Sequence, residues 1–105
     1  MSTLSTHVLD TAAGTPAAAM TVALREASGA VLETVATDDD GRARFDGEHA
    51  GVVVLRFETG AWLTAHDRPA FFPYVDVAVH LDDARPHHHV PLLLSPFGYS
   101  TYRGS

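Results

Sequence analysis

The chain has 105 residues, no cysteine and a formal net charge of −6 at neutral pH, which is typical of a single acidic domain over residues 1–105. This composition excludes disulfides, Cys-ligated zinc and thiol nucleophiles, and the lack of a Lys/Arg cluster excludes a surface that tracks nucleic-acid phosphates. No signal-peptide pattern opens the chain and no apolar run approaches the roughly 20 residues that span a bilayer, so we expect a cytoplasmic protein without a membrane partner.

Short runs with a period of two predict β-strands along most of the chain. In the first run, residues 3–10, Leu4, Thr6 and Val8 share one face, while Ser5 and His7 share the other. The same alternation recurs in three later runs, at residues 20–26, 51–58 and 74–81. With the remaining short runs we expect seven or eight strands, which is the pattern of an all-β sandwich.

Turn residues separate these runs. Glycine occurs in the segments 12–17 and 27–30, and an Asp-Gly pair occurs in the run 38–42. The three aspartates of 38–42 resemble the start of a calcium loop, but the glutamate twelve positions on is missing, so we expect a hairpin turn. Residues 59–67 lack the alternation and predict the one short helix.

Residues 87–95 place apolar side chains on both faces of a strand. Val90, Leu92 and Leu94 share one face, and the opposite face holds His87, His89, Pro91, Leu93 and Ser95. Because a sandwich covers only the inner face of each sheet, the outer face needs a partner subunit, and we expect an oligomer. Pro91 cannot donate a ladder hydrogen bond and predicts a local irregularity.

Three residues are candidates for chemistry. If the first and penultimate strands pair, His7 and His89 point into the same space, and an imidazole pKa near ~6.5 suits proton transfer. Arg42 follows the turn glycine and can present a bidentate donor to a carboxylate or urea-like group. Chance surface histidines are the competing interpretation, because the chain has seven. His87 and His89 share a face, but without cysteine or an HExxH helix we expect no functional metal site.

Five blocks of sequence occur in a recognisable order: "STHVLDTAAGTPA", "TDDDGR", "FFPYVDVAVH", "HHHVPLLLSPFGYS" and the closing "YRGS". Together they resemble the 5-hydroxyisourate hydrolase family, the transthyretin-related enzymes of urate degradation. The resemblance implies an all-β, transthyretin-like β-sandwich of two four-stranded sheets with one short helix. It also implies a homotetramer, a dimer of dimers, with active sites at the dimer–dimer interface and no cofactor.

The resemblance assigns roles to individual residues. His7, Arg42 and His89 take the catalytic positions, with the histidines activating water; His7 and Arg42 also bind substrate. The closing segment completes the substrate-binding wall with Tyr102, Arg103, Gly104 and Ser105. Which histidine is the general base stays open. His88 stands where the family has tyrosine, and its alternation directs it to the core side, where it needs a partner or a sheet edge.

The implied reaction is hydrolysis of 5-hydroxyisourate to 2-oxo-4-hydroxy-4-carboxy-5-ureidoimidazoline, by water attack on a cyclic amide. Two alternatives are open. A non-catalytic, transthyretin-like small-ligand binding protein would share the fold, but transthyretin lacks the His/Arg set and the Tyr-Arg-Gly-Ser end. A plain interaction domain explains the strands but not the coincidence of His7, Arg42, His89 and the closing residues.

Overall fold

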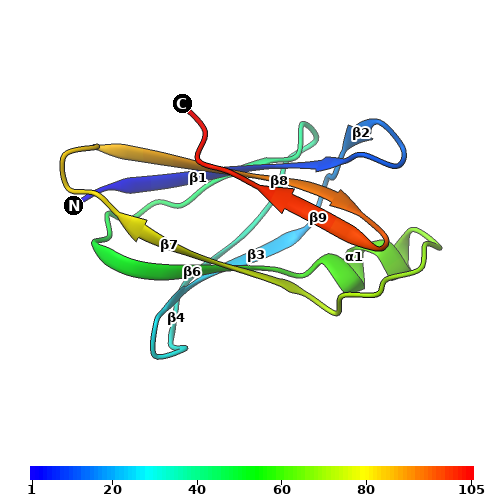
Figure 1. Cartoon of the computed structure of the whole chain (residues 1–105), viewed down its shortest axis with the longest axis horizontal. Coiled ribbons are helices and arrows are strands. Elements are labelled where there is room, and N and C mark those ends of the chain that lie inside the picture. The colour runs from blue at the N-terminus through cyan, green and yellow to red at the C-terminus, as the bar shows by residue number, and fades with distance from the viewer.

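Two β-sheets stack face to face, with a single short helix at one end (Figure 1). The structure is a computed structural model that describes all residues, 1–105. The elements in chain order are β1 (Thr3–Asp10), β2 (Thr15–Pro16), β3 (Thr21–Glu26), β4 (Val31–Ala36), β5 (Arg42–Arg44), β6 (Gly51–Phe57), α1 (Thr59–Ala65), β7 (Val75–Leu81), β8 (His87–Ser95) and β9 (Gly98–Thr101). The predicted all-β sandwich with one helix is confirmed.

The first sheet has the order β2-β1-β8-β9, and β5 also pairs with β1. Strands β1 and β8 run parallel and stay in register over eight residue pairs, from Thr3 opposite His87 to Asp10 opposite Leu94. Because β8 occupies one edge of β1, β5 and β2 share the other edge at different levels. The five strands of this sheet are therefore at most four wide at any level, with β9 present only beside Leu92–Ser95. The two-residue β2 is an addition that alternation could not predict.

The second sheet is antiparallel, in the order β4-β3-β6-β7. The core lies between the two sheets and contains 18 buried apolar residues. Among them Phe45 and Phe57 are the largest fully buried side chains, each worth roughly 1.5–3 kcal/mol of transfer free energy. The predicted apolar face of β1, which begins with Leu4, is buried, and that of β7 is buried except at Val79, which is half-buried.

Helix α1 covers one end of the sandwich. It buries Trp62 and Leu63, and the Trp62 Nε1–H donates to the Ala18 carbonyl at 2.7 Å. It ends two residues earlier than predicted, because Asp67 has a φ of 56°, outside the helical region. No helix in the structure is long and apolar enough to cross a membrane.

Pro91 interrupts one side of β8. The ladder between β8 and β9 ends with the pair Leu92 and Thr101, one residue before the proline. The Thr101 hydroxyl then donates to the Pro91 carbonyl at 2.7 Å. The parallel pairing with β1 continues through Pro91, so the irregularity that the proline predicts is confined to the β9 side.

A buried ion pair links β1 to the loop after α1. The Arg68 guanidinium donates to both carboxylate oxygens of Asp10, at 2.6 and 2.8 Å, and the Ala13 amide adds a third bond at 3.2 Å. The Asp10 side chain is 2% exposed. The hydrogen bonds from Arg68 are the main cause that lowers the pKa of Asp10.

We expect Asp10→Asn to flatten the acid dependence of stability. Because the folded pKa of Asp10 lies below its ordinary value of 3.8, the ion pair stabilises the fold fully above that value and is lost as the pH falls through the folded pKa. Urea titrations at several values between about pH 3 and pH 6 measure the effect. Asp39→Asn, which changes an exposed carboxylate, is the matched control. Equal slopes for Asp10→Asn and the wild type would contradict the expectation.

Candidate active site

Strand register lines up polar side chains in three rows across the outer face of the first sheet. The rows are Thr3 and His87; Arg44, Ser5 and His89; and Arg42, His7 and Pro91. Even-numbered residues of β1 point into the core, so these odd-numbered ones share the outer surface. The predicted pairing of the first and penultimate strands is confirmed, and it places His7 and His89 on the same face.

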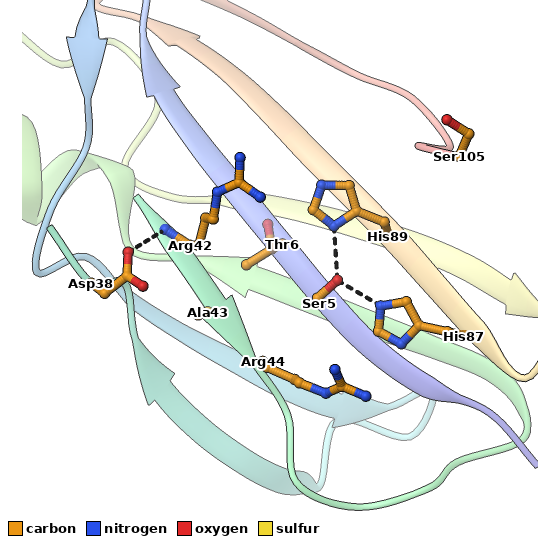
Figure 2. A pocket seen from close by; sticks show the side chains of 9 residues that line it. All are labelled: Ser5, Thr6, Asp38, Arg42, Ala43, Arg44, His87, His89 and Ser105. Atoms are coloured by element: carbon orange, nitrogen blue, oxygen red, sulfur yellow. Dashed lines mark hydrogen bonds between the residues drawn. The ribbon is translucent and has the colours of Figure 1, made fainter. Parts of the chain in front are cut away.

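A cavity of about 490 Å³ opens on this face between β5 and β8 (Figure 2). Its lining residues are Ser5, Thr6, Asp38, Arg42, Ala43, Arg44, His87, His89 and Ser105. Only one of the nine, Ala43, is apolar. Two arginines and two imidazoles in a polar wall suit a small ligand rich in carbonyl oxygens or bearing negative charge.

The Ser5 hydroxyl lies between the two imidazoles (Figure 2). Its Oγ is 2.8 Å from Nε2 of His87 and 2.8 Å from Nδ1 of His89. On the far side of His87, the Nδ1 atom is 2.6 Å from Oγ1 of Thr3. Both ring nitrogens of His87 are therefore hydrogen-bonded, whereas Nε2 of His89 makes no hydrogen bond within the chain.

Both imidazoles of the cavity favour the neutral form. Burial is the main cause that lowers the pKa of His89, followed by the charges of His7 and Arg42. Burial also lowers the pKa of His87, followed by the charge of Arg44. Since both pKa values lie below the ordinary 6.5, the rings are neutral at pH 7, the state in which an imidazole accepts a proton.

The turn before β5 sets the position of Arg42. Gly41 has a φ of 76°, and a Cβ there would collide with the Val8 carbonyl, so the turn requires glycine. Asp38 caps the turn by accepting the Arg42 backbone N–H at 2.9 Å. The Arg42 guanidinium itself is exposed and forms no salt bridge, which leaves its donors available to a ligand.

His7 lies beside the cavity and does not line it. Its Nε2–H donates to the Asp40 carbonyl at 2.8 Å, so the same turn holds both His7 and Arg42. This bond fixes the proton of the neutral ring on Nε2, since a carbonyl oxygen only accepts. His7 is thus adjacent to the His89 and Arg42 pair, with its Nδ1 atom as the nitrogen that can accept a proton.

The closing residues divide between two places. Ser105 lines the cavity, and the Gly104 N–H donates to the His89 carbonyl at 2.8 Å. Tyr102 and Arg103 instead line a second, more apolar cavity of about 300 Å³ beside β7. The reason is that the chain leaves the β9 ladder after Thr101 and rejoins β8 only at Gly104. Within one chain, Ser105 alone of these four residues lines the cavity, and the substrate-binding wall that they were expected to form stays a prediction.

His88 points inward, as its alternation predicts, and it is 6% exposed. Its Nε2 accepts the Asp82 backbone N–H at 3.2 Å, while its Nδ1 has no partner. The ring lies at the edge of the sandwich and lines the second cavity. A histidine at this position therefore satisfies one of its two nitrogens, at a sheet edge.

Sequence reasoning gave no role to Ser5, Thr3 or Arg44, which the structure places beside the histidines. The available signal was the run of polar residues at positions 3, 5 and 7, on the face that turns away from the core. No group of three or more His, Asp or Glu side chains is placed to hold a metal ion. The chemistry available here is proton transfer by imidazole and charge stabilisation by guanidinium.

We expect Gly104→Ala to lower kcat/KM for 5-hydroxyisourate, the substrate that the resemblance implies, by about 10²-fold. The reason is that the new Cβ displaces His89, and small displacements of a catalytic group carry costs of that size. A Cβ on Gly104 would lie 2.6 Å from Cδ2 of His89, so either the ring or the closing segment must shift. Steady-state kinetics measure the loss. Gly98→Ala, where the new Cβ meets only Ser95 Oγ at 3.8 Å, is the matched control. Equal activity of both variants would show that the close contact does not position His89.

The model of the HIUase/Transthyretin family matches residues 4–104. The chain belongs to this family. A 5-hydroxyisourate hydrolase of Mesorhizobium japonicum is 46% identical over 114 residues, covering 97% of this chain and 91% of the relative. The structure of Klebsiella pneumoniae 5-hydroxyisourate hydrolase superposes with a TM-score of 0.90 at 42% identity, covering 99% and 100% of the two chains. Sea bream transthyretin, solved with thyroxine, has a TM-score of 0.86 at 29% identity, covering 96% and 93%.

The HIUase/Transthyretin family thus includes proteins of two kinds on one fold. A 5-hydroxyisourate hydrolase and a transthyretin in complex with thyroxine both superpose on this chain over nearly its full length. The fold alone therefore does not separate an enzyme from a carrier. An argument for one or the other must therefore come from the polar cavity of this chain, with its imidazoles and guanidinium groups.

Proposed function

We propose that this chain hydrolyses 5-hydroxyisourate to 2-oxo-4-hydroxy-4-carboxy-5-ureidoimidazoline, the activity that its relatives' name describes. The observation that carries the proposal is the pairing of a neutral His89, whose Nε2 is free, with the unpaired guanidinium of Arg42 in one polar cavity. A free imidazole nitrogen can deprotonate water, and a guanidinium can stabilise the oxyanion that water attack creates.

The proposed reaction uses His89, Arg42 and His7 in turn. Nε2 of His89 takes a proton from water while the water oxygen bonds to the carbonyl carbon of the cyclic amide. Arg42 donates to the carbonyl oxygen, which carries the negative charge of the tetrahedral intermediate. The C–N bond then breaks, and the proton passes from the imidazolium to the departing ring nitrogen. His7, held by Asp40 at the cavity edge, orients the substrate and assists proton transfer; no cofactor takes part.

A carrier of hydrophobic ligands is the alternative that the fold permits. Such carriers present apolar walls to their ligand, whereas eight of the nine residues lining this cavity are not hydrophobic. The lining therefore favours hydrolysis over carriage. Tight binding of an apolar, thyroid-hormone-like ligand without turnover of 5-hydroxyisourate would reverse this choice.

We propose that the chain assembles as a homotetramer, a dimer of dimers. Leu93 supports this assembly, because it is an apolar residue on the outer face of β8 that is only half-buried within one chain, where no second sheet covers that face. Pro91, on the same face, is already buried within the chain. Analytical ultracentrifugation tests the proposal, and a monomer at micromolar concentration would contradict it.

The cytoplasmic location stays a prediction.

The direct test of the activity uses freshly generated 5-hydroxyisourate. Its ultraviolet absorbance decays spontaneously, and we expect the protein to accelerate that decay in proportion to its concentration. Heat-denatured protein is the control for general base catalysis by surface groups. A decay no faster than the spontaneous one would overturn the proposed function.

We also expect activity to fall in acid with a midpoint below pH 6.5. The active form of His89 is the neutral ring, and burial with the neighbouring cations lowers its pKa from 6.5, so protonation and loss of activity occur only below that value. The pH profile of kcat/KM for the free enzyme measures the midpoint. Titration of the His89 ring by NMR provides an independent value. A kinetic midpoint that differs from the NMR pKa of His89 would exclude His89 as the group that controls this limb, and a His89 pKa above 6.5 would contradict the lowered pKa.

A further inference from the structure

The side chains behind His89 form a continuous hydrogen-bonded chain that ends on a backbone carbonyl. Nδ1 of His89 contacts Ser5 Oγ at 2.8 Å, and Ser5 Oγ contacts Nε2 of His87 at 2.8 Å. Nδ1 of His87 contacts Thr3 Oγ1 at 2.6 Å, and the Thr3 hydroxyl donates to the Pro86 carbonyl at 3.3 Å. We call the side chains of Thr3, His87 and Ser5 the support array.

The number of available protons determines which atom donates and which accepts in each of these hydrogen bonds. The Pro86 carbonyl can only accept, so the Thr3 hydroxyl donates to it and Thr3 Oγ1 must accept from the Nδ1–H of His87. The Nε2 of a neutral His87 is then bare and accepts the Ser5 hydroxyl. The Ser5 oxygen in turn accepts the Nδ1–H of His89, and each of the four contacts holds one proton.

The opposite direction satisfies fewer groups. If Thr3 donated to His87 instead, its bond to the Pro86 carbonyl would be lost, and only three of the four contacts would hold a proton. The Nε2 of His89 would then carry the proton and could not take one from water. Hydrogen-bond satisfaction thus favours the direction that leaves Nε2 of His89 bare.

The other side of His89 is closed by the end of the chain. The Gly104 N–H donates to the His89 carbonyl at 2.8 Å, and a Cβ at Gly104 would lie within 2.6 Å of the ring. The ring is therefore held between Ser5 and Gly104, so that its Nδ1 stays on the support array. Its Nε2 makes no hydrogen bond within the chain and is therefore the ring nitrogen that is available to a ligand in the cavity.

We propose that Thr3, His87 and Ser5 are positioning residues that hold His89 in its Nδ1–H tautomer and thereby make Nε2 the general base. The assignment as a base rests on the proposed hydrolysis, whereas the tautomer is a property of the resting protein. His87 lines the same cavity, but both of its ring nitrogens are hydrogen-bonded, to Thr3 and to Ser5.

The tautomer is measured directly by NMR of protein labelled with ¹⁵N-histidine. At about pH 8, well above the ordinary imidazole pKa near 6.5, the rings are neutral, and the His89 signals are assigned by their absence from the His89→Gln spectrum. We expect a protonated, pyrrole-type Nδ1 and a bare, pyridine-type Nε2. A protonated Nε2 in the wild type would overturn the proposal.

Paired variants test each hydroxyl of the support array. Ser5→Ala removes the acceptor of the His89 Nδ1–H, so we expect averaged nitrogen shifts from two exchanging tautomers and a loss of about tenfold in kcat, near the value of one hydrogen bond. Ser5→Thr retains a hydroxyl and restores the wild-type pattern. Thr3→Val removes the acceptor of the His87 Nδ1–H and so affects His89 only through His87 and Ser5. We expect it to shift the His89 proton from Nδ1 towards Nε2, and Thr3→Ser, which retains the hydroxyl, is its control.

The outcomes separate the tautomer from the reaction. An unchanged His89 spectrum in folded Ser5→Ala and Thr3→Val would overturn the support array even in an active enzyme. If Ser5→Ala fails to fold, Thr3→Val alone decides, because that residue lies farther from the cavity and valine retains the β-branched shape. A wild type with the expected tautomer that leaves 5-hydroxyisourate untouched would remove the proposed function and keep the array.

Discussion

Replacing His89 by glutamine is expected to lower kcat/KM for 5-hydroxyisourate by about 10²–10⁴-fold, the contribution of a positioned general base. Glutamine is polar and of similar length, but its amide cannot take a proton from water at neutral pH. The loss should appear mainly in kcat, because substrate binding by Arg42 is retained. Steady-state and single-turnover measurements of the ultraviolet decay separate the two parameters.

The matched control for His89→Gln is His80→Gln. His80 is an exposed histidine on β7, in the other sheet, and its side chain makes no hydrogen bond. Its replacement removes the same chemical group from the chain without touching the cavity of His89, so kcat/KM should stay near the wild-type value. Comparable losses in the two variants would point to a general effect on folding or assembly, and full activity of His89→Gln would remove His89 from the mechanism.

The face shared by His7 and His89 was predictable from sequence, because side-chain direction along a strand follows position alone. The contact of Ser5 with His87 and His89 was not, because it depends on the register between strands separated by 82 and 84 positions in the chain. Alternation fixes which face a residue occupies and is silent on its partner across the sheet. The support array was therefore visible only in the structure.

The closing residues show a second limit of pattern reasoning. The resemblance grouped Tyr102, Arg103, Gly104 and Ser105 into one wall, as neighbours in sequence. In the structure the hydrogen-bond ladder of β9 stops beside Pro91, which has no N–H, and resumes only at Gly104. This gap sends Tyr102 and Arg103 to the sandwich edge. Their predicted contact with substrate stays a prediction, which only an assembled complex with ligand can test.

The same site explains how one fold serves both a hydrolase and a carrier. The core that holds the two sheets together uses inward-facing apolar residues, and none of the candidate catalytic side chains belongs to it. The proposed chemistry instead uses odd-numbered positions of β1 and β8 and the turn before β5. Changes at a few outward positions can therefore convert a polar cavity into an apolar one while the free energy of folding is hardly altered.

Replacing Arg42 by glutamine is expected to lower kcat/KM by about 10²–10³-fold, the usual cost of losing a donor to the oxyanion. The effect should exceed any change in substrate affinity, because negative charge on the carbonyl oxygen is greatest in the transition state. Arg42→Lys retains the charge but not the planar pair of donors, so its activity should lie between the wild type and Arg42→Gln.

Arg44→Gln is the matched control for Arg42→Gln, since both arginines lie on β5, line the same cavity and carry the same charge. Arg44 is in the row of Ser5, one row away from His7. If Arg42 acts by a directed hydrogen bond, its loss persists at high salt and Arg44→Gln is far milder. If both act only through long-range attraction, the two variants lose similar activity and the loss shrinks as salt screens the charges. Equal, salt-sensitive losses would therefore contradict the assignment of Arg42 to the oxyanion.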